Sequence, residues 1–191
     1  MKTIGITGGI GSGKSVVSRL LETMNIPVYN TDKEAKRITS TSRIIKEKLI
    51  QKFGQELYND NELNKKKLAS LIFNNPINLN YVNSVIHPEV FEDFSFWKKT
   101  IFGKAFVGIE SAILFESGLN KMTDIDILVS APLELRIERV ILRDNLNKEE
   151  ILNRIRNQMS EEEQKYLADY IVFNDNVQAL IPQINTFINQ L

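Results

Sequence analysis

Residues 3–15 read TIGITGGIGSGKS, and they decide the fold because they join a short apolar run to a phosphate-binding loop. Residues 8–15 match the pattern G-x-x-x-x-G-K-S in full. Apolar residues then recur at helical spacing from Val16 to Met24, which predicts a helix directly after the loop. A strand, a glycine-rich loop and a helix in this order indicate a nucleoside triphosphate site. The alternative is a glycine-rich turn with a chance Gly-Lys-Ser, which the agreement of all three parts disfavours.

The residues of this loop predict how a nucleotide would bind. Glycines let successive backbone N–H groups point at the β-phosphate, where the positive end of the helix dipole adds to them. We expect Lys14 to reach the β- and γ-phosphates and Ser15 to offer its hydroxyl to Mg²⁺. The loop therefore predicts that the chain binds a nucleotide, but it does not define the reaction that the chain catalyses.

Composition narrows the class of protein. The chain has 191 residues, with 24 basic and 24 acidic side chains and a formal net charge of zero, so no whole-chain charge favours a nucleic acid or membrane partner. It has no cysteine and one histidine, which excludes disulfides, thiolate metal sites and all-histidine metal sites. No stretch approaches the roughly 18 apolar residues of a membrane span. We expect a soluble, cytoplasmic protein.

Short apolar strands alternate with longer helical patterns along the chain. This alternation is typical of an α/β protein, here a three-layer αβα P-loop fold around a five-stranded, mostly parallel sheet. The strands are predicted at residues 3–7, 27–29, 105–109, 125–129 and 170–173.

About 70 residues separate the second and third predicted strands, too many for a single crossover helix. Gly54 is expected to end one helix, Pro76 to begin another, and His87-Pro88 to break the last pair. The segment therefore predicts an inserted helical subdomain. Its helical patterns cover residues 32–38, 42–53, 63–73, 77–86 and 89–100.

Arginines gather between the fourth and fifth predicted strands. Arg136, Arg139 and Arg143 are spaced i, i+3, i+7, so one helical face presents all three. As a group they predict a lid, because guanidinium groups brought over a transferring phosphoryl stabilise its charge while water is expelled. The alternative is a solvated helix face balanced by nearby acidic residues.

Two acidic residues lie just after predicted strands, at the edge where ligands of open α/β sheets bind. Asp32 follows the second strand and could accept the proton of an attacking hydroxyl, or Thr31 or Asp32 could instead cap the next helix. Glu110 ends the third strand, where an acid can bind Mg²⁺ directly or through water, although a strand-end glutamate can also be merely solvated.

Further short motifs follow one another along nearly the whole chain. They are YNTD at 29–32, LNKKKLA at 63–69, IHP at 86–88, LFE at 114–116, RVILRD at 139–144 and AD at 168–169. Together with the phosphate loop they resemble the dephospho-CoA kinase family. That family transfers the γ-phosphate of ATP to the ribose 3′-hydroxyl of dephospho-CoA, the last step of coenzyme A biosynthesis, and its fold is similar to that of nucleoside monophosphate kinases.

The resemblance implies an organisation and a set of site residues. It implies a nucleotide-binding core at 1–30, 101–135 and 166–191, a helical acceptor subdomain at 31–100 and a helical lid at 136–165. It also implies ATP with Mg²⁺, dephospho-CoA as acceptor, no nucleic acid or membrane partner, and a monomer or weak homo-oligomer. The catalytic residues would be Asp32, Lys14, Arg139 and Arg143; the nucleotide contacts Gly9, Gly11, Ser12, Gly13, Lys14, Ser15, Val16 and Asn174; the acceptor contacts Thr7, Asp32 and His87; and the metal ligands Ser15 and Glu110, the latter directly or through water.

Three positions depart from the family pattern. Asn30 stands where the family has a first aspartate, and Glu110 stands where it has a shorter acid. Asn176 replaces a glycine after the fifth strand, and because asparagine tolerates left-handed backbone, we expect that turn to survive.

Other classes remain open at this point. Another P-loop kinase, acting on a nucleoside monophosphate or a sugar, would have a similar core and lid. An inactive nucleotide-binding module is the non-enzyme alternative, and the presence of Lys14, Ser15, Asp32 and Arg139 argues against it. His87, beside a proline, could equally be a residue of a helix terminus.

Overall fold

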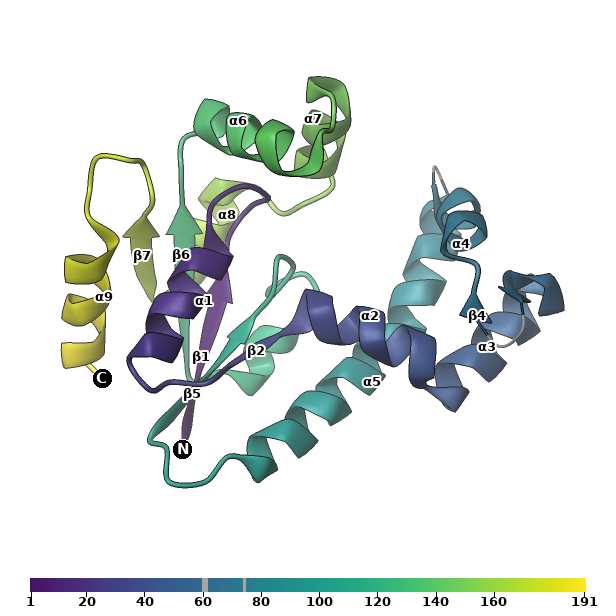
Figure 1. Ribbon diagram of the computed structural model, residues 1–191, viewed down its shortest axis with the longest axis horizontal. Coiled ribbons are helices and arrows are strands. Elements are labelled where there is room, and N and C mark those ends of the chain that lie inside the picture. The colour runs from purple at the N-terminus through teal and green to yellow at the C-terminus, as the bar shows by residue number, and fades with distance from the viewer. Residues whose placement is uncertain (60–61, 74) are drawn as a thin grey trace. The chain divides into compact units, whose positions relative to one another are not determined.

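The computed structural model describes residues 1–59, 62–73 and 75–191, which form two compact units (Figure 1). The core unit comprises Met1–Asn30 and Phe102–Leu191, and the helical unit comprises Thr31–Ile101. In the core unit the elements are β1 Lys2–Thr7, α1 Lys14–Thr23, β2 Val28–Asn30, β5 Phe106–Glu110, the short 3₁₀ helix η2 Leu119–Met122, β6 Ile125–Ser130, α6 Leu133–Asp144, α7 Lys148–Arg156, α8 Glu161–Leu167, β7 Tyr170–Phe173 and α9 Leu180–Asn189.

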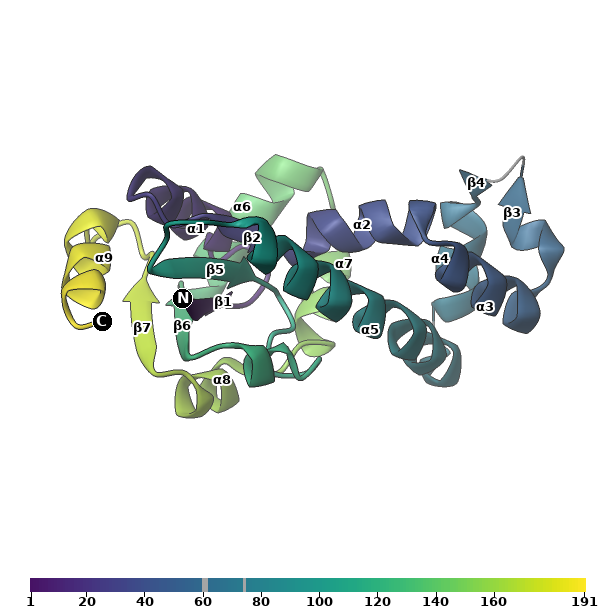
Figure 2. The ribbon, with the colours of Figure 1, turned by 90° about the horizontal axis from the view of Figure 1, so that it is seen from below.

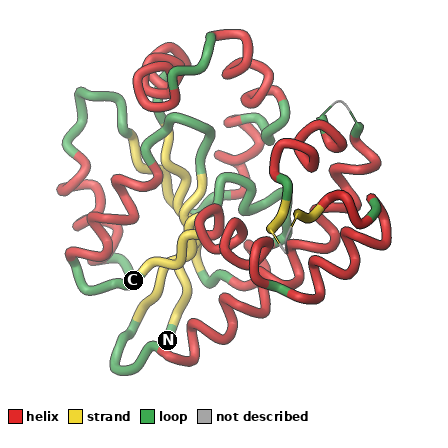
Figure 3. Tube along the Cα trace, turned by 45° about the vertical axis from the view of Figure 1, so that its right-hand side comes forward, coloured by secondary structure: helices red, strands yellow, loops and turns green. Residues whose placement is uncertain are grey.

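The core unit is built on a single sheet, whose strands are drawn in yellow in Figure 3. The strand order is β2-β5-β1-β6-β7, and every neighbouring pair is parallel. In the register, Ile6 of β1 lies opposite both Glu110 of β5 and Ile127 of β6. The five predicted strands are confirmed. Because all strands are parallel, their carboxyl ends, where Thr7 and Glu110 lie, meet at one edge.

Helices cover both faces of this sheet, as the predicted three-layer fold requires. Ile4 and Ile6 of β1 pack with Val17 and Leu21 of α1 in one cluster, and Phe187 of α9 belongs to the same cluster. Helix α8 contacts β6, and Figure 2 shows it on the opposite side of the sheet from α1. Burying each such aliphatic side chain contributes about 1.5–3 kcal/mol, so this cluster holds the phosphate-loop helix firmly on the sheet.

The helical unit is described by itself. It packs its helices around a small core that includes Ile38, Leu49, Val82 and Phe94, all buried. Its elements are α2 Thr31–Thr41, α3 Arg43–Phe53, the 3₁₀ helix η1 Gln55–Leu57, β3 Tyr58–Asn59, β4 Glu62–Leu63, α4 Lys65–Ile72 and α5 Pro76–Thr100. Among the residues described, no helix in either unit is long and apolar enough to cross a membrane.

The predicted helix break at His87-Pro88 is wrong, because α5 runs unbroken from Pro76 to Thr100 with Pro88 inside it. A proline in a helix interior costs about 3 kcal/mol, since it lacks an N–H and crowds the preceding turn. Val90 and Phe94, both buried, lie beyond the proline, and burying them contributes a similar amount. The helix therefore continues because its second half has a core to cover.

A short hairpin was not predicted. Tyr58 pairs with Leu63 and Asn59 with Glu62 in an antiparallel β3–β4 ladder. Strands of two residues are too short for hydrophobic alternation to reveal them. As a result, the helix predicted from residue 63 begins only at Lys65, after Asn64 accepts a capping hydrogen bond from the N–H of Lys67 (3.0 Å).

Candidate active site

The phosphate loop joins β1 to α1 at the carboxyl edge of the sheet, as predicted. Gly11 and Gly13 have φ of 79° and 94°, in the left-handed region that favours glycine. Side chains are also excluded there by contact. A Cβ at Gly11 would lie 2.4 Å from the carbonyl oxygen of Arg136, and one at Gly13 would lie 2.0 Å from Asn174 Nδ2. Two independent constraints thus require glycine at these positions.

Lys14, Ser15 and Val16 form the first turn of α1, directly after the loop. The Lys14 ammonium donates to the carbonyl oxygens of Gly8 (2.7 Å) and Gly9 (3.4 Å), so it lies folded back against the loop. Ser15 and Val16 are exposed in the first turn of α1, where the helix dipole favours an anion. The N–H of Val16 already donates to the carbonyl of Gly13 (2.9 Å). Ser15 is thus the residue of this turn that offers an exposed hydroxyl to a metal ion.

Asn174 and Arg139 meet the loop from two other elements. Asn174 Nδ2 donates to the carbonyl of Ser12 (2.8 Å), and Arg139 donates to the carbonyl of Asn174 (3.0 Å) and to Asn176 Oδ1 (2.7 Å). Asn176 has φ of 66°, which confirms that asparagine keeps the left-handed turn. In addition, its side-chain oxygen accepts a hydrogen bond from Arg139, and a glycine has no side chain that could do so.

The three arginines on the predicted helical face have different surroundings. Arg136, only 6% exposed, donates from Nε to the carbonyl of Ile10 (2.9 Å) and forms an ion pair with Glu161 (3.4 Å). Burial lowers the pKa of Arg136, and the Glu161 carboxylate opposes that shift. Arg143 is 62% exposed at its side chain and pairs with Asp144 (2.8 Å). The alternative interpretation of these arginines, a solvated helix face, therefore holds only for Arg143.

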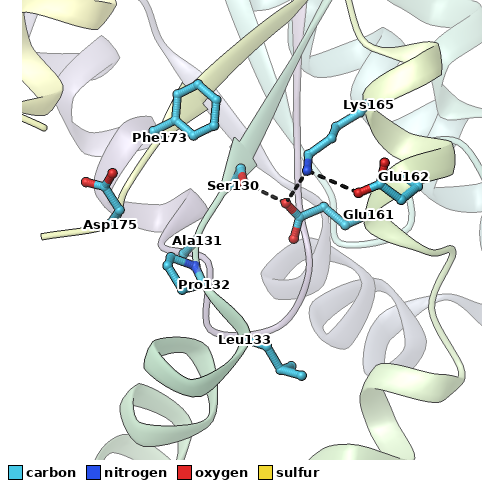
Figure 4. Close-up of a pocket in the computed structure, with 9 residues that line it drawn as sticks. All are labelled: Ser130, Ala131, Pro132, Leu133, Glu161, Glu162, Lys165, Phe173 and Asp175. Carbon is cyan, nitrogen blue, oxygen red and sulfur yellow. Dashed lines mark hydrogen bonds and ion pairs between the residues drawn. The ribbon is translucent and has the colours of Figure 1, made fainter. Parts of the chain in front are cut away.

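Arg136 belongs to a network that sequence reasoning missed. Ser130 at the end of β6 donates to Glu161 (2.6 Å), and Lys165 pairs with Glu161 (3.2 Å) and Glu162 (3.3 Å), as Figure 4 shows. These groups line a pocket of about 390 Å³. Every ionic side chain in the network already has a partner, so it functions as support for Arg136.

Glu110 ends β5 beside the phosphate loop and is 8% exposed. Asn30, at the end of β2, donates from Nδ2 to Glu110 Oε2 (3.0 Å). An aspartate at position 30 would repel this carboxylate, whereas the amide orients it. Within the described residues, no three His, Cys, Asp or Glu side chains gather as a metal site.

The predicted acceptor residues are divided between the two units. Asp32 is exposed in the first turn of α2 and makes no hydrogen bond or ion pair with the described residues, so it does not cap that helix. His87 lies half-buried on α5, stacked on Phe91 (6.3 Å between ring centroids), and burial lowers its pKa. In the core unit, Thr7 is fully buried, and its hydroxyl lacks a hydrogen-bond partner among the described residues.

A parallel sheet whose first strand leads through G-x-x-x-x-G-K-S into a helix defines a P-loop nucleotide-binding protein. A family model described as dephospho-CoA kinase matches residues 2–179. The chain therefore belongs to the dephospho-CoA kinase family, and it is a kinase.

Individual relatives agree with this assignment. A dephospho-CoA kinase from Bacteroides fragilis is 47% identical over 181 residues, which cover 95% of this chain and 88% of the relative. The crystal structure of TT1252 from Thermus thermophilus has a TM-score of 0.87 and 34% identity, covering 100% of this chain and 97% of that one. A dephospho-CoA kinase from Campylobacter jejuni has a TM-score of 0.67 and 27% identity, covering 100% of this chain and 96% of that one.

Proposed function

We propose that this chain transfers the γ-phosphoryl group of ATP to the ribose 3′-hydroxyl of dephospho-CoA, giving coenzyme A and ADP. The observation that carries the proposal is the family match over residues 2–179, together with a phosphate loop whose lysine, serine and glycines are all present. The family match supplies the acceptor, and the loop supplies the donor site.

On the donor side, the backbone N–H groups of the loop and Lys14 hold the β- and γ-phosphates. Mg²⁺ would be held by the hydroxyl of Ser15 and, through water, by Glu110, which Asn30 orients. When bound there, it neutralises charge that develops on the phosphate oxygens. The buried hydroxyl of Ser12 makes no hydrogen bond with the described residues, so the loop retains polar capacity for a ligand.

On the acceptor side, Asp32 accepts the proton of the 3′-hydroxyl as its oxygen forms a bond to the γ-phosphorus. The bond from that phosphorus to the β–γ bridging oxygen breaks, and its electron pair leaves with ADP. The helical unit binds the acceptor, with His87 from that unit and Thr7 from the core unit as contacts. Residues 136–165 act as the lid, and they carry Arg139 and Arg143.

The cellular setting belongs to the same proposal. The reaction consumes ATP, and we propose that the chain acts in the cytoplasm on small molecules, without nucleic acid or membrane partners, as a monomer or weak homo-oligomer. Its 24 basic and 24 acidic side chains balance, so the net charge of the whole chain favours neither of these partners.

The test is ADP release measured over a panel of acceptors: dephospho-CoA, nucleoside monophosphates and simple sugars, each with and without Mg²⁺. We expect turnover with dephospho-CoA only, with the product identified by mass spectrometry as coenzyme A. Faster turnover of a nucleoside monophosphate or sugar would identify a different small-molecule kinase. ATP binding without turnover of any acceptor would identify an inactive nucleotide-binding module.

A further inference from the structure

The tip of the phosphate loop is held from outside the loop. The N–H of Ile10 donates to Gln158 Oε1 (2.9 Å), and its carbonyl accepts from Arg136 Nε (2.9 Å). Both partners come from the segment between β6 and β7, far along the chain from the loop. Both polar groups of the Ile10 backbone are therefore fixed by side chains.

Gln158 makes a second bond that gives it a wider role. Its Nε2 donates to the carbonyl of Ala112 (3.2 Å), two residues after Glu110 at the end of β5. The next residue, Met159, donates its N–H to Glu116 Oε1 (2.8 Å) and so holds this turn in place. One amide group thus connects the phosphate loop to the strand end that carries Glu110.

We propose that Gln158 is a positioning residue for nucleotide binding: its amide bridges the phosphate loop and the β5 end, and so keeps the loop in the form that receives phosphates. The physical reason is conformational entropy. The N–H of Ile10 donates to Gln158 and the N–H of Ser12 donates to the carbonyl of Gly9 (3.1 Å), so the tip of the loop has a defined shape before a ligand binds. A loop with a free tip must be ordered at the moment of binding, and fixing one residue's backbone reduces affinity by about tenfold.

A tight network could also be explained as support for the fold alone. Two observations favour a role in binding. Gln158 is only half-buried, so its loss leaves no sealed cavity, and its two bonds end on loop backbone rather than on the hydrophobic core. The expected consequence is a change in nucleotide affinity larger than the change in stability.

The decisive variant is Gln158→Met, which keeps the length of the side chain and removes both hydrogen bonds. The matched control is Asn157→Ala, since the neighbouring amide is exposed and makes no hydrogen bond to the loop among the described residues. Calorimetry should show the Kd for ATP raised about tenfold in Gln158→Met and unchanged in the control. The Ile10 amide, assigned by NMR, should exchange faster with solvent in Gln158→Met only.

Gln158→Glu is the second variant. It keeps an acceptor for the Ile10 N–H but turns a carboxylate oxygen toward the Ala112 carbonyl and adds a negative charge beside the loop, so its Kd for ATP should rise at least as far as in Gln158→Met. A folded Gln158→Met with a Kd within twofold of the wild type overturns the proposal. Should Gln158→Met not fold, a Kd within twofold of the wild type in Gln158→Glu overturns it equally. The inference rests only on the nucleotide-binding part of the proposed function, and because no acceptor is used, its failure is distinguishable from failure with dephospho-CoA.

Discussion

At the carboxyl edge of the sheet, cationic side chains donate hydrogen bonds to backbone carbonyls, whereas at the amino edge carboxylates accept them from backbone N–H groups. At the carboxyl edge, Lys14 and Arg136 each donate to the phosphate loop. At the amino edge, Asp124 accepts from the N–H of Thr3 (2.6 Å) and Asp169 accepts from that of Asp126 (2.8 Å). At the first edge, cationic side chains lie against the loop that we propose to bind phosphates. The second satisfies the N–H groups where strands begin.

The two edges of this sheet are therefore expected to differ in role, the carboxyl edge in nucleotide binding and turnover and the amino edge in stability. Substitutions at the carboxyl edge should alter turnover or nucleotide binding and have little effect on unfolding. Substitutions at the amino edge should alter unfolding and leave turnover unchanged.

The largest effect is expected for Lys14→Ala. Removing the ammonium that lies against Gly8 and Gly9 deletes the point charge on the β- and γ-phosphates, so we expect phosphoryl transfer to fall below detection. ADP release under saturating ATP and dephospho-CoA measures it, with Lys121→Ala, an exposed lysine elsewhere in the core unit, as the control. Turnover equal to that of the control would mean that the phosphate loop is only a turn.

The next largest effect is expected for Asp32→Asn. Asp32 lies two residues beyond the carboxyl end of β2. The amide keeps the shape of the side chain but cannot accept the hydroxyl proton, so kcat should fall by roughly 10²- to 10⁴-fold with little change in ATP affinity. Because Asp32 makes no hydrogen bond within the described residues, unfolding should hardly change. A variant with normal kcat would remove Asp32 from the chemistry and leave the acceptor site without a base.

A smaller effect is expected for the arginines of α6. Arg139→Ala removes contacts to Asn174 and Asn176 beside the loop, whereas Arg143→Ala breaks only an exposed pair with Asp144. If both arginines act in a closing lid, each variant should lower kcat about 10- to 100-fold more than it raises the KM for dephospho-CoA, and Arg→Lys should restore little.

Hydrogen exchange completes this test. Residues 136–165 should exchange faster than the sheet in the free enzyme and slow down when both substrates bind. Loss of kcat in Arg139→Ala alone would restrict the catalytic role to the arginine that contacts the loop. Full activity in both variants, with exchange unchanged on ligation, would refute the lid.

The donor site was largely predictable from sequence because its parts are local. The apolar run, the loop pattern and the helical spacing from residue 3 to residue 24 fix β1, the phosphate loop and α1 within one short segment. Arg136 and Gln158 contact Ile10 across 126 and 148 residues of sequence, and the periodicity of hydrophobic residues does not predict contacts between segments so far apart. The predicted break at Pro88 failed for the same reason: only the assembled core shows that the second half of α5 has something to bury.

The last prediction concerns Asp126, at the amino edge of the sheet. We expect its substitution to leave turnover unchanged. Asp126 is 7% exposed, its Oδ1 has no hydrogen-bond partner among the described residues, and Gly5 makes room for it, since a Cβ there would lie 2.0 Å from that oxygen. Burial raises the pKa of Asp126 to about 6 from 3.8, and the Asp169 charge adds to the shift. A folded-state pKa above the unfolded value means that the folded state binds more protons between these two pH values.

This carboxyl therefore favours the folded state most below pH 4, and that contribution is lost as the pH rises through 6. Asp126→Asn removes the buried charge, so the variant should gain up to about 3 kcal/mol in the free energy of unfolding at pH 8 and almost nothing at pH 4. Urea unfolding at several pH values measures the difference, with the exposed Glu22→Gln as the control. A gain that does not depend on pH would show that it does not come from ionisation of the carboxyl, and a loss of turnover would show that the two edges are not independent.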